Sequence, residues 1–342
     1  ICSFLYAGCK GEMDGILYDI RWLKKYKDKK GWFNIPILAR ELIIRCILSV
    51  WNALSFEYKQ SVIKKIEEFF KRVLKEGELN IYTTNYDPLL YEATKNLDID
   101  FGFRKKDTEG ILKFSGYDYL KASNALSFLH GFVGFFPRSD GKQILLNEDY
   151  NFVAKKRIKT LFENNPLGYD LRTCIITRRS YCRDTYIITG LDKYQAFYAL
   201  PYSTYLYRFS EDIKKADYII IIGSSLEDEH INLFLNNALF SNPKKIIYVD
   251  YLDGQHIKEE WENIFSDVNS PIIKLWSIFW QSSISFALDS LSYEALKNQY
   301  ISKSDDLEKR GYCQLTKELI YYRKGVEQFF EDGVGFIDEC VR

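Results

Sequence analysis

Two short runs of apolar, mostly β-branched residues constrain the fold of this 342-residue chain more than any other feature. Residues 218–222 and 245–249 are apolar on both faces, which is typical of strands in a parallel sheet that is covered on both sides. A helical pattern over residues 229–240 separates the two runs, and the three elements predict a β-α-β unit. The expected fold class is therefore α/β.

The rest of the chain alternates between strand and helix patterns, as an α/β fold requires. Further strands are predicted at residues 2–6, 80–84, 125–129 and 271–276, and a hairpin from 132–136 to 142–146 around an Asp140-Gly141 turn. Helices are predicted over residues 36–54, 58–75, 148–162 and 195–215, and a mostly helical segment from 284 to 340.

The charge balance and the composition exclude several classes of protein. The chain has 47 Lys and Arg against 47 Asp and Glu, and this zero net charge argues against a general nucleic-acid binder. Hydrophobic residues make up 46% and aromatic residues 16%, so the chain is not disordered and can bury a sizeable core. No apolar run reaches the ~18 residues of a membrane span, and we expect a soluble protein.

Cysteine and histidine usage points to a reducing compartment and away from a metal site. The seven cysteines are odd in number and none are spaced Cys-x-x-Cys, which favours a cytoplasmic protein. With only three histidines, no metal site of the usual spacing can be drawn, and we predict none. Because the chain begins at Ile1 rather than Met, we expect that it is a fragment of a longer protein.

Small, polar and ionisable residues follow the ends of the predicted strands. Ligands of an open parallel sheet bind beyond the carboxyl ends of its strands, so we expect these residues to gather at one edge. In chain order they are Ala7, Gly8 and Cys9, then Thr84, Asn85 and Asp87, then His130, then Gly223, Ser224 and Ser225, and finally Asp250.

Each of these residues also has a purely structural interpretation. Asp87, which precedes a proline, is a good helix N-cap, and Asn85 suits an Asx turn. His130 ends an apolar strand, where a lone histidine is more often a core residue. Residues 223–225 could form only a tight strand-to-helix turn, and Asp250 could cap a turn or bind a ribose diol.

Three segments together resemble a known family. They are Thr84-Asn85-Tyr86-Asp87, then Phe128-Leu129-His130-Gly131, and then Gly223-Ser224-Ser225-Leu226 with Asp228 and His230-Ile231. Over roughly residues 1–276 the chain resembles the sirtuin-like domain of bacterial anti-phage proteins. The resemblance implies a Rossmann-like parallel sheet with helices on both faces over residues 1–280, a helical insert at about 20–78, and a helical C-terminal segment over 281–342.

This family resemblance implies an enzyme that cleaves the nicotinamide–ribose bond of its substrate NAD. It implies that Asn85 orients the nicotinamide ribose and the attacking water, and that His130 is the general base. The implied NAD-binding residues are Ala7, Gly8, Cys9, Thr84, Asp87, Gly223, Ser224, Ser225 and Asp250. Nicotinamide leaves as a neutral molecule, and the developing oxocarbenium character is compatible with an uncharged amide and an imidazole that titrates at roughly pH 6.5.

The chain departs from the family pattern in two places. The paired Cys-x-x-Cys zinc ligands of sirtuin deacylases are absent, since Cys174 and Cys182 lie eight residues apart, and this argues against deacylation. The first glycine loop reads Tyr6-Ala7-Gly8-Cys9-Lys10, where the family has Gly-Ala-Gly followed by a small residue and Ser. Lys10 could narrow the phosphate site or pair with the diphosphate.

The leading hypothesis is an NAD hydrolase that acts as the toxic effector of an anti-phage abortive-infection system. The resemblance implies control by assembly, as a homo-oligomer or with a partner defence protein or a fused sensor domain. The charge balance and the absence of a long apolar run argue against nucleic acid and a membrane as direct partners. The alternative is a catalytically weak, sirtuin-like nucleotide-binding or scaffolding module within a larger complex. The irregular first loop favours the alternative, and the presence of both Asn85 and His130 favours the enzyme. Hydrolysis and cyclisation of ADP-ribose are not distinguished.

Overall fold

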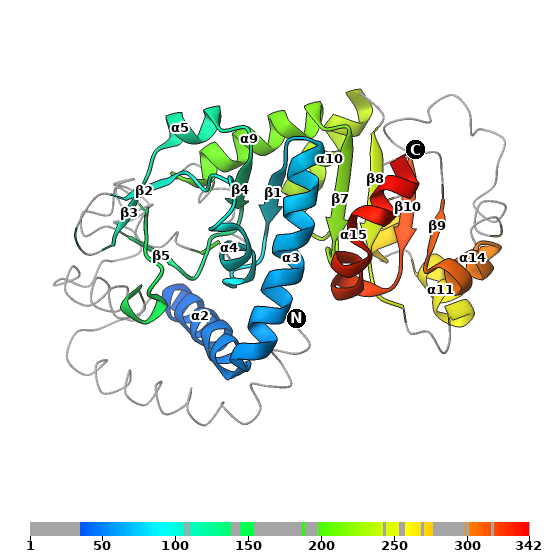
Figure 1. Ribbon diagram of the computed structural model, residues 1–342, viewed down its shortest axis with the longest axis horizontal. Helices are drawn as coiled ribbons and strands as arrows, with labels where there is room; N and C mark the ends of the chain where they lie inside the picture. Colours follow the sequence, from blue (N-terminus) through cyan, green and yellow to red (C-terminus); the bar gives the residue numbers. More distant parts are fainter. Residues whose placement is uncertain are drawn as a thin grey trace. The chain divides into compact units, whose positions relative to one another are not determined.

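The computed structural model describes residues 35–105, 108, 110–137, 144–153, 187–188, 197, 199–241, 244–252, 257–267, 270–275, 298, 301–315 and 318–341. The chain divides into two units, Ile1–Tyr207 and Arg208–Arg342, and Figure 1 labels their helices and strands. Each unit is considered by itself below. Within the described residues, no helix has both the length and the apolar character needed to cross a bilayer.

Two helices begin the described part of the first unit, α2 (Ile35–Ala53) and α3 (Phe56–Glu76), and both were predicted. The N-cap of α3 is Ser55, whose side-chain oxygen accepts a hydrogen bond from the Tyr58 N–H at 3.1 Å. The residues that α3 buries recur at helical spacing and include Ile66 and Phe70, so the amphipathic pattern predicted this helix and its buried face.

The first unit contains two small sheets. One pairs β1 (Asn80–Thr83) with β4 (Ala125–Phe128) in parallel. The other is antiparallel, in the order β2 (Phe103–Lys105), β3 (Leu112–Phe114), β6 (Ile144–Leu146) and β5 (Phe135–Pro137). The β5–β6 pairing confirms the predicted hairpin, whose turn lies outside the described residues. Two short helices complete the unit, α4 (Leu89–Thr94) and α5 (Gly116–Lys121).

An aromatic cluster forms the core beside the end of β4. The rings of Phe128 and Phe132 stack at 4.5 Å between centroids, and Tyr91 of α4 lies 5.3 Å from Phe132. All three residues are 0% exposed. Aromatic side chains bury large areas in fixed geometry, so this cluster holds the chain on both sides of residues 129–131 in place.

The second unit contains the predicted β-α-β unit. Strand β7 (Tyr218–Ile222) follows α9 (Tyr202–Lys215) and leads through α10 (Glu229–Ser241) to β8 (Lys245–Val249), which pairs parallel with β7. Strand β10 (Leu319–Tyr322) lies parallel to β8 on its other side, and β9 (Tyr312–Gln314) is antiparallel to β10. Further helices of this unit are α11 (Ile257–Ser266), α14 (Ser304–Arg310) and α15 (Gly325–Val341).

Helices lie on both faces of the sheet of the second unit. Tyr321 and Tyr322 are consecutive in β10, so their side chains point to opposite faces. The ring of Tyr321 lies 4.8 Å from Trp261 of α11, and the ring of Tyr322 lies 5.3 Å from Phe329 of α15. This arrangement explains why β10, and β8 after its first residue Lys245, are apolar on both faces.

One prediction for the C-terminal part of the chain is incomplete and another is wrong. Residues 284–340 were predicted to be mostly helical; their described part includes α14 and α15, but it also supplies β9 and β10, because the buried run 319–322 pairs with β8. Residues 271–276 were predicted to be a strand, but residues 271–275 are helical. Ser270 begins this helix, since its hydroxyl accepts from the Ile273 N–H at 3.4 Å and its carbonyl accepts from the Lys274 N–H at 3.0 Å.

The α/β class is therefore confirmed, while the single Rossmann-like sheet is not seen. The described strands form one two-stranded and two four-stranded sheets. The predicted first strand at residues 2–6 and the start of the helical insert, residues 20–34, lie outside the described residues.

Candidate functional site

The first unit brings Asn85 and His130 to the same edge of one sheet. Thr83, the last residue of β1, pairs with Phe128, the last residue of β4. The Leu129 N–H donates to the Thr83 carbonyl at 2.8 Å, so the two chains stay together for one more residue. Asn85 and His130 each lie two residues beyond the paired strand ends, at the carboxyl edge predicted from the sequence.

The loop that carries Asn85 is stabilised by hydrogen bonds from its backbone N–H groups to side-chain oxygens of the same loop. The Asn85 N–H donates to Thr83 Oγ1 at 3.0 Å, and the Leu89 N–H donates to Asp87 Oδ1 at 2.9 Å at the start of α4. Asp87 thus has the helix-start role that the sequence left open, and its burial raises the pKa of its carboxyl group against the opposing effect of that backbone hydrogen bond. Thr84 and Asn85 themselves are exposed and accessible to a ligand.

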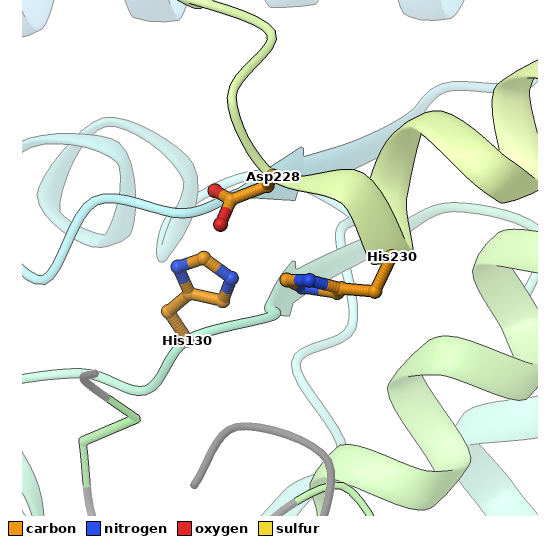
Figure 2. Close-up of side chains that lie close together, drawn as sticks. All are labelled: His130, Asp228 and His230. Atoms are coloured by element: carbon orange, nitrogen blue, oxygen red, sulfur yellow. The ribbon is translucent and has the colours of Figure 1, made fainter. Parts of the chain in front are cut away.

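His130 is buried and its backbone is held by a short bridging segment. The residue is 4% exposed, and its ring stacks with Phe197 at 6.5 Å between centroids. The Ile188 N–H donates to the His130 carbonyl at 2.7 Å. Figure 2 shows His130 on the chain that leaves the strand. The surroundings fit both interpretations of this residue, a core histidine and an oriented general base.

The second unit gathers the other described candidates at the carboxyl edge of its own sheet. Gly223 ends β7 with a φ of 59°, and its N–H donates to the Val249 carbonyl of β8 at 3.1 Å. Ser224 and Ser225 follow, and the Ser224 carbonyl accepts from the Tyr248 hydroxyl at 2.7 Å. Gly223 and Ser225 are exposed, so backbone groups of this turn are open to a ligand.

Asp250 ends β8 at the same edge of the second unit. Its backbone N–H donates to the Tyr322 carbonyl at 2.9 Å, and its Oδ1 accepts from the Tyr251 N–H at 2.8 Å. Burial raises the pKa of the Asp250 carboxyl group, and the hydrogen bond from Tyr251 opposes that shift. A carboxylate at the end of a strand is a residue type that accepts hydrogen bonds from a ribose diol.

Asp228 and His230 form an acid–imidazole pair at the start of α10. A carboxylate oxygen of Asp228 and a ring nitrogen of His230 lie within 4.8 Å of each other, and Figure 2 shows both at the beginning of the helix. The Asp228 carbonyl accepts from the Ile231 and Asn232 N–H groups at 2.9 and 3.0 Å. The sequence analysis gave His230 no role beyond its place in the family resemblance.

The remaining candidates lie outside the described residues. They are Ala7, Gly8 and Cys9 of the first loop with Tyr6 and Lys10, and the two cysteines Cys174 and Cys182. The predicted diphosphate loop is therefore still a prediction.

Comparison with known proteins adds no assignment. No protein-family model matches the sequence, and no curated protein matches it. Function is therefore argued from the residues of the site and their geometry.

Proposed function

We propose that this protein hydrolyses the nicotinamide–ribose bond of NAD, releasing nicotinamide and ADP-ribose. The observation that carries the proposal is the placement of Asn85 and His130 at corresponding positions beyond two paired parallel strands. An amide and an imidazole at one carboxyl edge provide the two uncharged groups that this reaction needs. The proposal includes a Rossmann-like NAD-binding fold and a cytoplasmic location.

The proposed reaction needs one proton acceptor and no acid. The oxygen of a water molecule bonds to C1′ of the nicotinamide ribose, while the C1′–N1 bond breaks and its electron pair leaves with nicotinamide. Nicotinamide departs neutral because N1 of the bound cofactor carries a positive charge. The proton lost by water passes to the imidazole of His130. The Asn85 amide orients the water and the ribose hydroxyls, because it can both donate and accept hydrogen bonds.

The surroundings of His130 support the role of a general base. A base that is already oriented does not have to be ordered during the reaction, and correct placement lowers the barrier. The Ile188 hydrogen bond fixes the backbone of His130, and the imidazole lies beside the ring of Phe197, 6.5 Å away between centroids. Asn85, which is exposed, is the member of the pair that meets an incoming substrate.

The proposal also assigns nucleotide contacts to the second unit, as the family resemblance implies. The exposed turn at Gly223 and Ser225 offers backbone groups for polar contacts, and Asp250 offers a carboxylate for the ribose diol. Ala7, Gly8 and Cys9, with Thr84 and Asp87, remain proposed contacts on the basis of the family resemblance. No metal is part of the proposal.

The proposed biological role is that of a toxic effector in anti-phage abortive infection. It rests on the resemblance alone, as does control by a homo-oligomer, a partner defence protein or a fused sensor domain. NAD loss kills or arrests a cell, so an enzyme of this kind has to be held inactive until it is triggered.

One observation favours a second candidate function, a nucleotide-binding or scaffolding module with little catalysis. His130 is 4% exposed, which is also what a core histidine shows. The two functions differ in turnover. Incubation of the purified chain with NAD, followed by chromatography for nicotinamide and ADP-ribose, is expected to show both products in equal amounts. A module that only binds nucleotide releases neither, and a cyclase gives cyclic ADP-ribose instead.

A further inference from the structure

Thr83 contacts both of the loops that carry the proposed catalytic residues. It is the last residue of β1 and is 7% exposed. Its carbonyl accepts a hydrogen bond from the Leu129 N–H at 2.8 Å, and its side-chain Oγ1 accepts one from the Asn85 N–H at 3.0 Å. This one residue therefore connects Asn85 with the residue that directly precedes His130.

Tyr86 forms a second connection between the same two segments. The Val133 N–H donates to the Tyr86 carbonyl at 3.0 Å. The bond to Thr83 comes from the residue before His130, and the bond to Tyr86 comes from a residue after it. Asn85 lies between Thr83 and Tyr86, so both proposed catalytic residues lie between the two points at which their segments are joined.

Between these two points, the Thr83 side chain holds the backbone of Asn85. Asn85 is exposed, so packing contributes little to its position. A hydroxyl that accepts from the N–H two residues later closes a tight local turn. Thr83 is buried and β-branched, so its χ1 is restricted and its Oγ1 acceptor stays in one place. The hydrogen bond thus determines the point from which the Asn85 side chain leaves the backbone.

We infer that the Thr83 hydroxyl positions Asn85 for the cleavage of NAD. The inference rests on the proposed function for the reaction itself, in which the Asn85 amide orients the water and the ribose hydroxyls. A small displacement of an orienting group lowers the rate of such a reaction. Thr83 is buried and acts through Asn85, so it is a positioning residue and not a catalytic one. The role requires a hydroxyl at residue 83 and does not require the methyl group.

Steady-state kinetics of nicotinamide release by the full chain tests this role with two complementary variants. Thr83→Val keeps the shape of the side chain and removes the acceptor. It is expected to lower kcat by about 2- to 12-fold, the factor that corresponds to one hydrogen bond, with KM unchanged. Thr83→Ser keeps the hydroxyl and loses a buried methyl group, so it is expected to be less stable than the parent and yet to have the parental kcat.

Thr94→Val is the matched control within the same unit. Thr94 is 0% exposed in α4, and its Oγ1 donates to the Leu90 carbonyl at 2.7 Å. This substitution also removes a buried hydroxyl and its hydrogen bond, but the bond does not involve the loop that carries Asn85. Its kcat is expected to equal that of the parent. A decrease in kcat as large as that of Thr83→Val would show that lost stability explains both effects, and it would overturn the inference.

Site-resolved hydrogen exchange at the Asn85 N–H gives a readout that does not depend on turnover. An N–H that is hydrogen-bonded in the native state exchanges with solvent only when that bond opens. The Asn85 N–H is therefore expected to be protected in the parent and in Thr83→Ser, and to lose its protection in Thr83→Val. Equally fast exchange in the parent and in Thr83→Val would overturn the inference.

The two readouts separate this inference from the proposed hydrolase activity. An active parent whose Thr83→Val variant keeps the parental kcat would refute the positioning role alone, and so would a loss of kcat in Thr83→Ser equal to that in Thr83→Val. A parent that releases no nicotinamide would refute the proposed function. Protection of the Asn85 N–H that depends on the Thr83 hydroxyl would in that case still support Thr83 as the group that holds Asn85.

Discussion

The Tyr86 hydroxyl donates a hydrogen bond to the Ile188 carbonyl at 2.8 Å. Ile188 in turn donates its N–H to the His130 carbonyl at 2.7 Å. The loop that carries Asn85 therefore contacts, through its next residue, the segment that holds the backbone of His130. Tyr86 and Ile188 thus connect the two proposed catalytic positions within the first unit.

Tyr86→Phe is expected to destabilise this connection without removing either proposed catalytic group. It deletes one hydrogen bond, and such a bond contributes about 0.5–1.5 kcal/mol to the free energy of unfolding. We expect a loss of that size in urea denaturation and a lower kcat for nicotinamide release. Tyr58→Phe, at a 52% exposed position on α3, is the control and is expected to change neither quantity. If Tyr86→Phe were as stable as the parent, the hydrogen bond would make no net contribution to the free energy of unfolding.

Asn85→Ala and His130→Ala are each expected to reduce the rate of nicotinamide release by at least about 100-fold. This is the lower end of the rate enhancement that a positioned general base contributes. Asn52→Ala, at an exposed position of α2, is the matched control for the amide. Thermal unfolding should be close to that of the parent for Asn85→Ala, since Asn85 is exposed. Release of nicotinamide at the parental rate by the double variant would remove the basis of the proposed mechanism.

The parts of the fold that could be predicted from the sequence are those whose local pattern and tertiary setting agree. The run 218–222 is strand-forming and apolar throughout, and its bounds were predicted to the residue. In the run 319–322 the strand depends on pairing with β8, which lies about 70 residues earlier in the chain and leaves no local signal. Residues 271–275 contain the β-branched pair Ile272-Ile273, but the Ser270 cap outweighs their strand preference.

The candidate site could be predicted only as far as backbone topology determines it. Asn85 and His130 share an edge because parallel strands end together, and the order of strands and loops already indicates this. The exposed position of Tyr251 could not be predicted in this way. Its exposure and its contact with Gly325 depend on how residues 250–252 pair with 323–325, a long-range arrangement.

Ser270→Ala tests the capping interaction that the sequence analysis missed. The hydroxyl accepts from the Ile273 N–H at 3.4 Å and donates to the Ile264 carbonyl at 2.7 Å, and the residue is 6% exposed. Removal of an N-cap side chain costs about 0.5–2 kcal/mol, and we expect that loss in the free energy of unfolding. Ser266→Ala, an exposed serine at the end of α11, should cost less than about 0.5 kcal/mol. Equal effects of the two substitutions would contradict the capping role.

Asp250→Asn is expected to stabilise the protein at neutral pH, with a gain that shrinks on acidification. Burial raises the pKa of the Asp250 carboxyl group above its unfolded value, so the native state binds its proton more tightly than the unfolded state does. The free energy of unfolding therefore falls as the pH rises from the pKa of this carboxyl group in the unfolded state to its pKa in the native state. Over this range the native protein has to ionise a buried group, which costs free energy. Asparagine keeps an acceptor for the Tyr251 N–H without that charge.

The measurement is the difference in unfolding free energy between Asp250→Asn and the parent at pH 7 and at about pH 3.5, below the ordinary pKa of aspartate. The difference should favour the variant at pH 7 and be smaller at the lower pH, while Asp98→Asn, an exposed control, should show no such trend. A difference that grows on acidification would mean that the charged form of Asp250 is stabilised by the fold, and the carboxylate would then be held in place for structure and not exposed to a ligand.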